Sequence, residues 1–297
     1  MSITVNTNVA SMIAQNNLSR TSDKLSNVLQ QLSTGLRINS AKDDAAGLAI
    51  AIGMKNQISG NERAKQNIQD GLNLMTTAEG GMEVIEDHLD RIRELCVQAA
   101  NEIYNTQNRI SILNEIKQRV SDIDVQSQTS NFNGIHLLNG TQSSLRLQFG
   151  AGTSAELNSL DIASALPNVR ISAGGINVQL KVTTNLTPAA AAAGYITAAD
   201  WDPDLIMSYM DKLDSALDTI TASRSKLGAF SNRLEANYNN LVTTNENIEQ
   251  SRSRIMDVDV AAASTQMTKY QILEQTTTSV LMQANQVPQL ALSLLGS

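Results

Sequence analysis

The sequence contains few aromatic residues and few prolines. Only 3% of its 297 residues are Phe, Trp or Tyr, so the apolar side chains are mainly Leu, Ile, Val, Met and Ala. The first of the four prolines is Pro167, and 84 residues without proline separate Pro203 from Pro288. Because proline is the strongest helix breaker, both halves of the chain permit long helices. This composition favours long helices packed side by side over a compact globule.

Cysteine, basic charge and long apolar runs are also scarce. The single cysteine, Cys96, excludes a disulfide framework and a multi-cysteine metal site. The net charge of -7 leaves no basic stripe, so we expect no nucleic-acid partner. The longest uncharged stretch, 275–297, is studded with Gln, Thr and Asn, which argues against membrane insertion. The first residues, MSITVNTNVA, have neither a basic n-region nor an apolar h-region, so we expect no cleaved signal peptide.

Residues that catalyse reactions or bind cofactors do not form a recognisable motif. The pair Gly174 and Gly175 lacks the spacing and the strand context of a phosphate-binding loop, so it indicates a turn. His88 and His136 are isolated, and each fits a surface or loop residue better than a catalyst. Cys96 continues a heptad track and fits a buried hydrophobe better than a reactive thiol. We therefore expect no enzyme activity, no catalytic residues, no cofactor and no metal.

The two chain ends carry almost no charge. Residues 1–33 contain three charged residues and residues 261–297 contain two, whereas the stretch between them holds the other 46. Both ends are rich in Asn, Gln, Ser and Thr. Such a composition is tolerable in a disordered monomer and useful if the ends are later buried among many neighbours.

Both ends nevertheless have helical periodicity. Apolar residues recur mostly at intervals of three, four or seven, which predicts one stripe on each helix. These residues are Val5, Val9, Met12, Leu18, Leu25, Leu29, Leu32 and Leu36 at the start, and Met267, Tyr270, Leu273, Val280, Ala284 and Val287 at the end. Two such helices could close an antiparallel coiled coil, which would make the termini neighbours.

The interior contains stronger heptad tracks. One passes through Ile68, Met75, Met82 and Leu89, and the other through Leu213, Ile220, Leu227, Leu234, Leu241, Ile248 and Ile255. The second predicts a supercoiled helix over 205–255, roughly 75 Å long. Its companion positions are mostly small or polar, which favours packing in a bundle over a two-stranded zipper. A third helical segment through Ile110, Leu113, Ile116, Val120 and Ile123 could complete that bundle.

Strand signals are confined to the middle of the chain. Alternating apolar residues predict short hairpins at two places, Leu145, Leu147 and Phe149, and then Ile176, Val178, Leu180 and Val182. The stretch from about 166 to 203 contains three prolines and an alanine run, which indicates an insertion.

The segment LSTGLRINSAKDDAAGLAI, 32–50, joins two helical stripes. Gly35 can end a turn, and Asn39 and Ser40 can begin the next helix, with Asp43 and Asp44 in its first turn. Glu86 and Asp87 form another adjacent carboxylate pair, and we expect both pairs to be solvated or to cap helices.

Several long motifs, in order along the chain, together resemble bacterial flagellin. They are MSITVNTNVAS, LSTGLRINSAKDDAAGLAI, RIRELCVQAAN, NFNG with LLNG, and SVLMQANQVPQLALSLL. The resemblance covers about residues 1–150 and 205–297. It implies a mainly α fold, a long antiparallel helical bundle and coiled coil with small β-hairpins. In family terms, 1–42 plus 256–297 form a terminal coiled-coil domain, 43–165 plus 204–255 form a helical rod domain, and 166–203 is a short variable insertion.

The resemblance implies a structural subunit that polymerises into the bacterial flagellar filament for motility. A hook-filament junction protein is the alternative, and a helical signalling rod would lack the terminal Asn-Val and Gln-Val-Pro motifs. The implied partners are other copies of the chain, the type III export apparatus, the filament cap and the hook-junction proteins. An export chaperone would hold about 264–295, and the chain would be extracellular, in the flagellum, without a cleaved signal peptide.

The resemblance also suggests site residues. Filament core packing is expected of Leu18, Leu25, Leu29, Leu32, Leu36, Met267, Leu273, Val280, Leu281 and Val287. Arg91, Leu95 and Glu115 match rod-domain positions that serve packing between subunits and contact a host Toll-like receptor. Cys96 departs from the family pattern, since a small apolar residue is usual there. The end at Gly296 and Ser297 also departs from it, since a basic residue is common there.

Overall fold

The computed structural model describes residues 7–152, 154, 158–170 and 203–295. The chain divides into two compact units, one from residues 1–58 and 244–297 and the other from residues 59–243. Long helices and two small antiparallel sheets make up the described chain, so the prediction of a mainly α fold with small hairpins is confirmed. The domain boundaries expected near 42 and 255 stay predictions. The second expected strand run, 176–182, lies outside the described residues.

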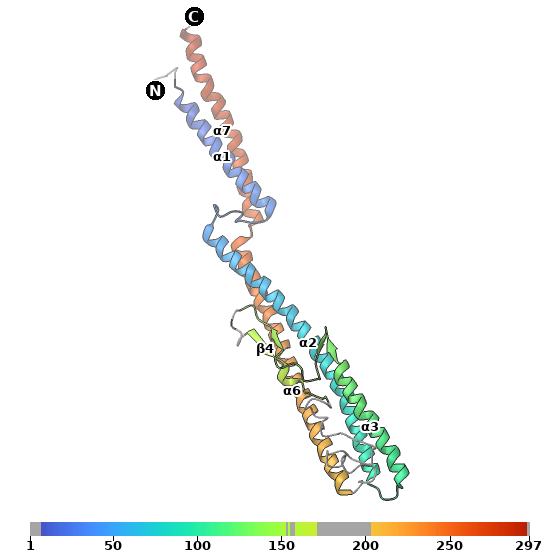
Figure 1. The fold of residues 1–297 in the computed structure, drawn as a ribbon. Helices are drawn as coiled ribbons and strands as arrows, with labels where there is room; N and C mark the ends of the chain where they lie inside the picture. Colours follow the sequence, from blue (N-terminus) through green and yellow to red (C-terminus); the bar gives the residue numbers. More distant parts are fainter. Residues whose placement is uncertain (1–6, 153, 155–157, 171–202, 296–297) are drawn as a thin grey trace. The chain divides into compact units, whose positions relative to one another are not determined.

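The first unit contains helix α1 (Val9–Thr34) and helix α7 (Val260–Leu295), which lie side by side (Figure 1). Asn8 caps the start of α1, since its side chain accepts a hydrogen bond from the Ser11 backbone N–H. Gly35 ends α1 in the left-handed conformation, φ 72°, which is easily reached only without a Cβ. Asp259 caps α7 by accepting from the backbone N–H groups of Ala261 and Ala262.

Helix α2 (Ala45–Ala99) starts later than the sequence suggested. Asn39 and Ser40 do not begin it, because their backbone N–H groups donate to the Asp43 carboxylate in a turn that precedes the helix. Asp44 is the capping residue, and its carboxylate accepts from the Gly47 N–H at 2.8 Å. The carboxylate of Asp44 therefore acts at the helix start, as expected, but one position before the first turn.

The second unit is built around α3 (Thr106–Thr129) and the parts of α2 and of α6 (Pro203–Met256) that lie within residues 59–243 (Figure 1). The predicted helix over 205–255 is confirmed by α6, and the third predicted segment by α3. Their heptad residues form one apolar core, which includes Ile68, Met75, Met82 and Leu89 from α2, Leu113, Ile116 and Ile123 from α3, and Leu213, Ile220, Leu227 and Leu234 from α6. Each of these side chains is at most 2% exposed. The three helices thus pack as a bundle, as the weak companion positions of α6 predicted.

Two short hairpins lie against these helices. Strands β1 (Asn131–Phe132) and β2 (Ile135–His136) are joined by Asn133 and Gly134, both at positive φ, as a tight two-residue turn requires. Strands β3 (Arg146–Gln148) and β4 (Ser159–Asp161) pair with Leu147 opposite Leu160. A 3-10 turn, η1 (Ala163–Ala165), follows. The strand predicted around Leu147 is therefore confirmed.

Candidate assembly interface

Helices α1 and α7 meet along one seam with heptad spacing. We define the seam as the buried and half-buried positions that recur at alternating intervals of three and four on each helix. These positions are Ser11, Ala14, Leu18, Thr21, Leu25, Val28 and Leu32 on α1, and Ala263, Met267, Tyr270, Glu274, Thr277, Leu281 and Ala284 on α7. Small, polar and apolar side chains alternate in it, so it is less uniformly apolar than the core of the second unit.

Polar contacts connect the two helices along the seam. The Asn8 amide donates to the Ala284 carbonyl at 2.7 Å, and the Ser11 hydroxyl donates to the Asn285 side-chain oxygen at 2.7 Å. The Lys24 ammonium lies 5.9 Å from the centre of the Tyr270 ring, within reach of a cation–π contact. These contacts fix an antiparallel pairing over the described length of both helices.

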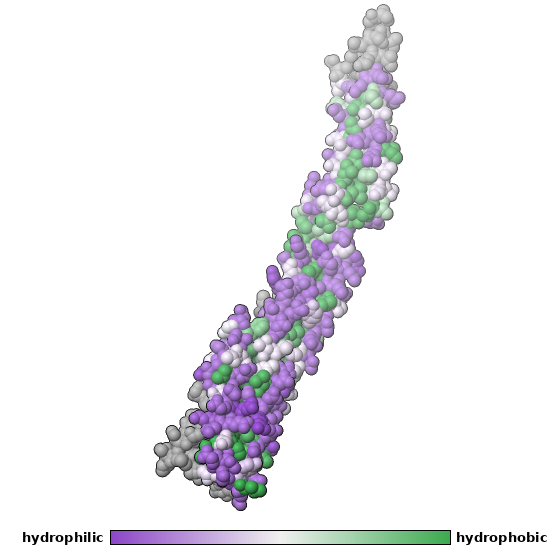
Figure 2. Space-filling view, turned by 90° about the vertical axis from the view of Figure 1, so that its right-hand side faces the viewer, coloured by the Kyte–Doolittle hydropathy of each residue, from purple (hydrophilic) through white to green (hydrophobic). Residues whose placement is uncertain are grey.

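Many large apolar side chains of this pair lie outside the seam and are exposed. They are Val9, Met12, Ile13 and Leu29 on α1, and Val260, Ile272, Leu273, Val280 and Met282 on α7. We call them the exposed apolar set. Figure 2 shows hydrophobic residues at the surface along this pair of helices. The apolar residues predicted to form a stripe on each terminal helix therefore differ in burial within the single chain, because only some of them meet the other helix. The stripe itself stays a prediction.

The residues expected in the filament core accordingly fall into three groups. Leu18, Leu25, Leu32, Met267 and Leu281 lie in the seam, and Leu36 is half-buried in the connector after α1. Leu29, Leu273 and Val280 belong to the exposed apolar set, with 46%, 40% and 49% of their surface accessible. The side chain of Val287 lies outside the described residues. A role in contacts between subunits stays a prediction for all of them.

Hydroxyl side chains on α7 donate hydrogen bonds to backbone carbonyls of the same helix. Thr265, Thr268, Thr276, Thr277, Thr278 and Ser279 each donate to the backbone carbonyl four residues earlier, at 2.7 to 3.1 Å. Such bonds leave few free donors on the surface of an almost uncharged helix.

The second unit carries the other predicted site residues. Arg91 is exposed and donates to Glu115 at 3.1 Å and to Glu94 at 2.8 Å, which ties α2 to α3. These ion pairs raise the pKa of the Arg91 guanidinium, mainly through its hydrogen bonds to Glu94 and Glu115. Leu95 is only 2% exposed and packs in the core. Arg91 and Glu115 thus offer charged groups at the surface, whereas Leu95 lies in the core.

The sequence did not predict the ion pairs between α2 and α6. Arg224 donates to Glu86 and also lies 3.6 Å from Glu79, and Arg93 donates to Asp214 at 2.8 Å. Glu86 is therefore not merely solvated, because a residue 138 positions away pairs with it. Nothing in the local sequence identifies a partner at that separation.

Cys96 and the histidines have no arrangement suited to catalysis. Cys96 is 1% exposed, and burial raises the pKa of its thiol to about 12, so the expectation of a buried hydrophobe is confirmed. His88 lies half-buried with its Nδ1 atom 3.3 Å from an Arg119 nitrogen, and His136 is an exposed strand residue.

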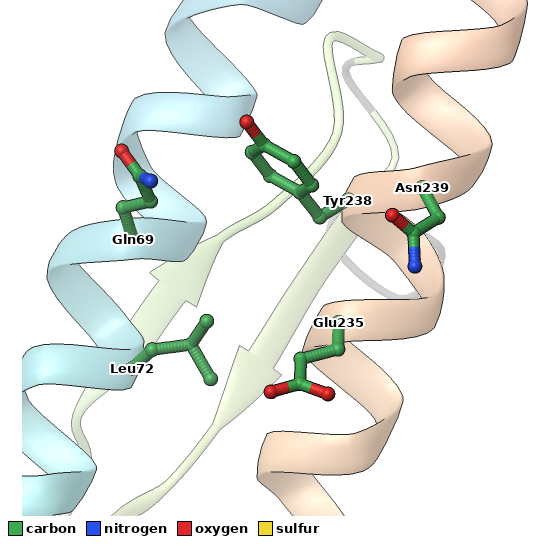
Figure 3. A pocket seen from close by; sticks show the side chains of 5 residues that line it. All are labelled: Gln69, Leu72, Glu235, Tyr238 and Asn239. Atoms are coloured by element: carbon green, nitrogen blue, oxygen red, sulfur yellow. The ribbon is translucent and has the colours of Figure 1, made fainter.

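A shallow pocket lies between α2 and α6 in the second unit. It is lined by Gln69, Leu72, Glu235, Tyr238 and Asn239. Figure 3 shows the two helices contributing these side chains from opposite sides. Within the described residues, no group of three or more His, Cys, Asp or Glu side chains could hold a metal ion, and no helix is long and apolar enough to cross a membrane.

Models of two family regions match most of the chain. The model described as the bacterial flagellin N-terminal helical region matches residues 5–143, and the bacterial flagellin C-terminal helical region matches residues 210–295. The chain belongs to the bacterial flagellin family. Flagellins are structural proteins, so this flagellin is a filament subunit and not an enzyme.

Curated relatives match this flagellin over nearly their full length. It is 38% identical to a flagellin of Halalkalibacterium halodurans, over 98% of this chain and 99% of that protein. It is 37% identical to a flagellin of Bacillus subtilis, with the same coverage. A flagellar filament 33 kDa core protein of Treponema phagedenis is 35% identical, again over 98% and 99%. These relatives identify the flagellar filament as the place where the protein works.

A solved structure shares the fold. It is titled a putative flagellar hook-associated protein from Vibrio parahaemolyticus, and it covers 72% of this chain and 100% of its own, with a TM-score of 0.56. At 13% identity this likeness concerns the fold alone. The alternative of a hook-filament junction protein is not favoured, since the full-length relatives at 32 to 38% identity include many proteins named flagellin.

Proposed function

We propose that this flagellin polymerises by burying the exposed apolar set of α1 and α7 against other copies of the chain. One observation carries the proposal, which is that large apolar side chains remain exposed on helices with almost no charge. Large exposed apolar surfaces mark interaction sites. The sparse charge means that little desolvation opposes its burial.

The free energies of ordering and burial support this view. Helix α1 has 26 residues and α7 has 36, and ordering each residue costs about 1 to 2 kcal/mol of backbone entropy. Full burial of a Leu, Ile or Val side chain contributes about 1.5 to 3 kcal/mol. In the described part of α1 and α7, only Ala14, Val28 and Ala263 are buried within the single chain. We therefore expect neighbouring copies to supply the contacts that hold these helices.

Removal of the terminal segments tests the proposal. A chain without residues 1–40 and 258–297 should keep the core of the second unit and remain folded, but should not elongate filament seeds. Circular dichroism would report folding, and electron microscopy of seeded samples would report elongation, with the full chain as the control. Filaments grown from the truncated chain would contradict the proposal.

We further propose the partners that such a subunit meets before assembly. The first of these partners is the flagellar type III export apparatus. An export chaperone that covers about 264–295 would hide α7 until the cap and the hook-junction proteins receive the subunit. Exposed apolar residues of α7, such as Ile272 and Met282, are the surface that such a chaperone would need to cover.

We also propose that Arg91 and Glu115 contact a host Toll-like receptor, with Leu95 holding them in position. The exposed ion pairs of Arg91 with Glu94 and Glu115 support this. Because such pairs contribute little free energy, Arg91 could give them up and pair with a receptor group instead. A receptor reporter assay with Arg91→Ala tests it, and signalling should fall several-fold. Arg93→Ala is the matched control, because Arg93 is an exposed neighbour that pairs with Asp214 instead. Equal signalling by both variants would remove Arg91 from the contact.

A further inference from the structure

Two Asn-Gly pairs lie close together in the second unit. They are Asn133 with Gly134 and Asn139 with Gly140. Asparagine is chemically least stable when glycine follows it, because a backbone nitrogen without a neighbouring side chain can reach the asparagine amide carbon. Both pairs have this property from their sequence, yet their surroundings in the structure differ.

Asn133 lies in an open turn. It connects β1 and β2, and both Asn133 and Gly134 are exposed. A Cβ at Gly134 would meet no atom within 4 Å, and no described residue is hydrogen-bonded to the Asn133 side chain. Asn133 also has a positive φ of 49°, which is uncommon for a residue other than glycine. Because the hairpin contains only two residue pairs, its local opening costs little free energy.

Asn139 is enclosed instead. It is 7% exposed, and its side-chain oxygen accepts hydrogen bonds from the Thr141 N–H at 3.0 Å and from the Thr141 hydroxyl at 2.6 Å. The backbone that follows is closely packed, since a Cβ at Gly140 would lie 2.3 Å from the Asn168 side chain. The Asn139 side chain can therefore rotate only if both bonds to Thr141 are lost.

We propose that Asn133 is a site of spontaneous deamidation in the folded chain, and that the bonds to Thr141 protect Asn139. At Asn133, the Gly134 nitrogen attacks the side-chain carbonyl carbon Cγ and forms an N–Cγ bond. The bond from Cγ to the amide nitrogen Nδ2 breaks, and Nδ2 leaves as ammonia, which takes up the proton that the Gly134 nitrogen loses. The product is a succinimide ring. Because hydroxide ion relays this proton, the rate should rise with pH.

Water then opens the ring at one of its two carbonyl carbons. The hydroxyl group of the water adds to that carbon, and its other proton goes to the ring nitrogen. Opening at Cγ gives aspartate, and opening at the backbone carbonyl gives isoaspartate, in which the main chain runs through the side chain. Both products add one negative charge to the exposed turn, and isoaspartate also lengthens it by one carbon atom. The core beyond β2 should be unaffected, because Leu137 and Leu138 are buried and the Leu137 N–H donates to the Ser130 carbonyl.

Peptide mapping of the full chain can test the two assignments. One tryptic peptide, 120–146, contains both Asn-Gly pairs, so mass spectrometry compares them in the same sample. The chain is kept in mildly alkaline buffer, either folded or unfolded in guanidinium chloride, and a zero-time sample corrects for conversion during digestion. In the folded chain, Asn133 should deamidate at least tenfold faster than Asn139, because opening around Asn139 breaks tertiary contacts. In the unfolded chain, the two rates should agree to within about threefold.

Substitution of Thr141 tests the protection of Asn139. Thr141→Val removes the hydroxyl that donates to the Asn139 oxygen, and Thr141 is itself exposed. Deamidation of Asn139 in the folded variant should become at least threefold faster, with the Asn133 rate unchanged. Thr129→Val is the matched control, because the hydroxyl of the exposed Thr129 donates to carbonyls of its own helix. Both rates in this control should equal those of the parent chain.

Three results would overturn the inference. The first is a folded chain in which Asn133 stays intact while the unfolded chain deamidates, since the turn would then protect it. The second is a folded chain in which Asn139 deamidates as fast as Asn133. The third is an unchanged Asn139 rate in Thr141→Val, which would remove Thr141 from the protection. Circular dichroism of each variant checks that the helices are retained, and none of these results depends on whether the chain elongates filament seeds.

Discussion

The two units of this flagellin bury their apolar side chains to very different extents. In the second unit the heptad residues of α2, α3 and α6 are almost completely enclosed, as Met82 and Leu227 illustrate. In the α1–α7 pair, some apolar residues with the same periodicity lie in the seam, and the others are exposed to solvent. Apolar periodicity thus indicates that a helix has a partner, but not whether that partner belongs to the same chain. On the proposed function, this difference separates a part that folds alone from a part completed by assembly.

The largest expected effect comes from the exposed apolar set. Leu273→Ser combined with Val280→Ser should reduce seeded elongation more than tenfold, because each removes an apolar contact worth about 1.5 to 3 kcal/mol when buried. Monomer stability in urea should change by no more than about 0.5 kcal/mol, since both side chains are exposed. Gln275→Ser, an exposed polar position on α7, should elongate like the parent. If the double variant elongates seeds as fast as the parent chain, the proposed role of the exposed apolar set is contradicted.

The core of the second unit should respond in the opposite way. Leu227 is 1% exposed, and Leu227→Ala should lower the free energy of unfolding by about 2 to 5 kcal/mol, because it leaves a cavity. Urea unfolding followed by circular dichroism measures this change. Met207→Ala, on the same helix but 65% exposed, should change it by less than about 1 kcal/mol. Similar losses for the two variants would show that this core is not closely packed.

Two adjacent glycines of α2 sharpen the comparison within one helix. A Cβ at Gly81 would lie 2.5 Å from the Ser130 hydroxyl oxygen and 2.9 Å from a Leu138 methyl, whereas a Cβ at Gly80 meets nothing within 4 Å. Gly81→Ala should destabilise the chain by about 1 to 3 kcal/mol through overpacking. Gly80→Ala should stabilise it by about 0.5 to 1 kcal/mol, since alanine favours helices. Thermal unfolding of both variants measures these changes. If Gly81→Ala stabilises the chain, the predicted overpacking at Gly81 is contradicted.

The smallest effect is expected from pH. The Asp161 carboxylate accepts from the backbone N–H groups of Leu145 and then Ala163, which holds its pKa below the ordinary value of 3.8. Its contribution to stability is therefore complete above that value and is lost as pH falls through the lower folded pKa. Asp161→Asn should remove this part of the pH dependence and leave a shallower loss of stability in acid. Urea midpoints of the parent and the variant, compared across acidic pH, would show parallel curves if Asp161 has no such role.

Much of the fold could be predicted from the sequence, because long heptad tracks report buried helix faces directly. The track through Leu213 and Ile220 predicted α6. The hairpin of β1 and β2 around the Asn-Gly pair was not among the predicted strands. Cys96 was placed correctly by its heptad position. Features that depend on distant partners could not be predicted in this way. The pair of Arg224 with Glu86 is one, and the exposure of Leu273 beside the seam is another.

The start of α2 shows a more local limit. Asn39, Ser40, Asp43 and Asp44 are all good capping residues, so their types alone allow several start positions. The structure uses Asp43 to hold a turn and Asp44 to begin the helix. Residue types alone do not decide between these two roles.

The hydrogen bonds of the α7 threonine hydroxyls have a consequence for the proposed contacts between copies of the chain. A hydropathy scale counts the threonines from Thr265 to Thr278 as polar, yet their hydroxyls are occupied by carbonyls of their own helix. What these threonine side chains present to a neighbour is largely their methyl groups. Close contacts between copies along α7 can therefore form without trapped water, even though the sequence there is rich in hydroxyl groups.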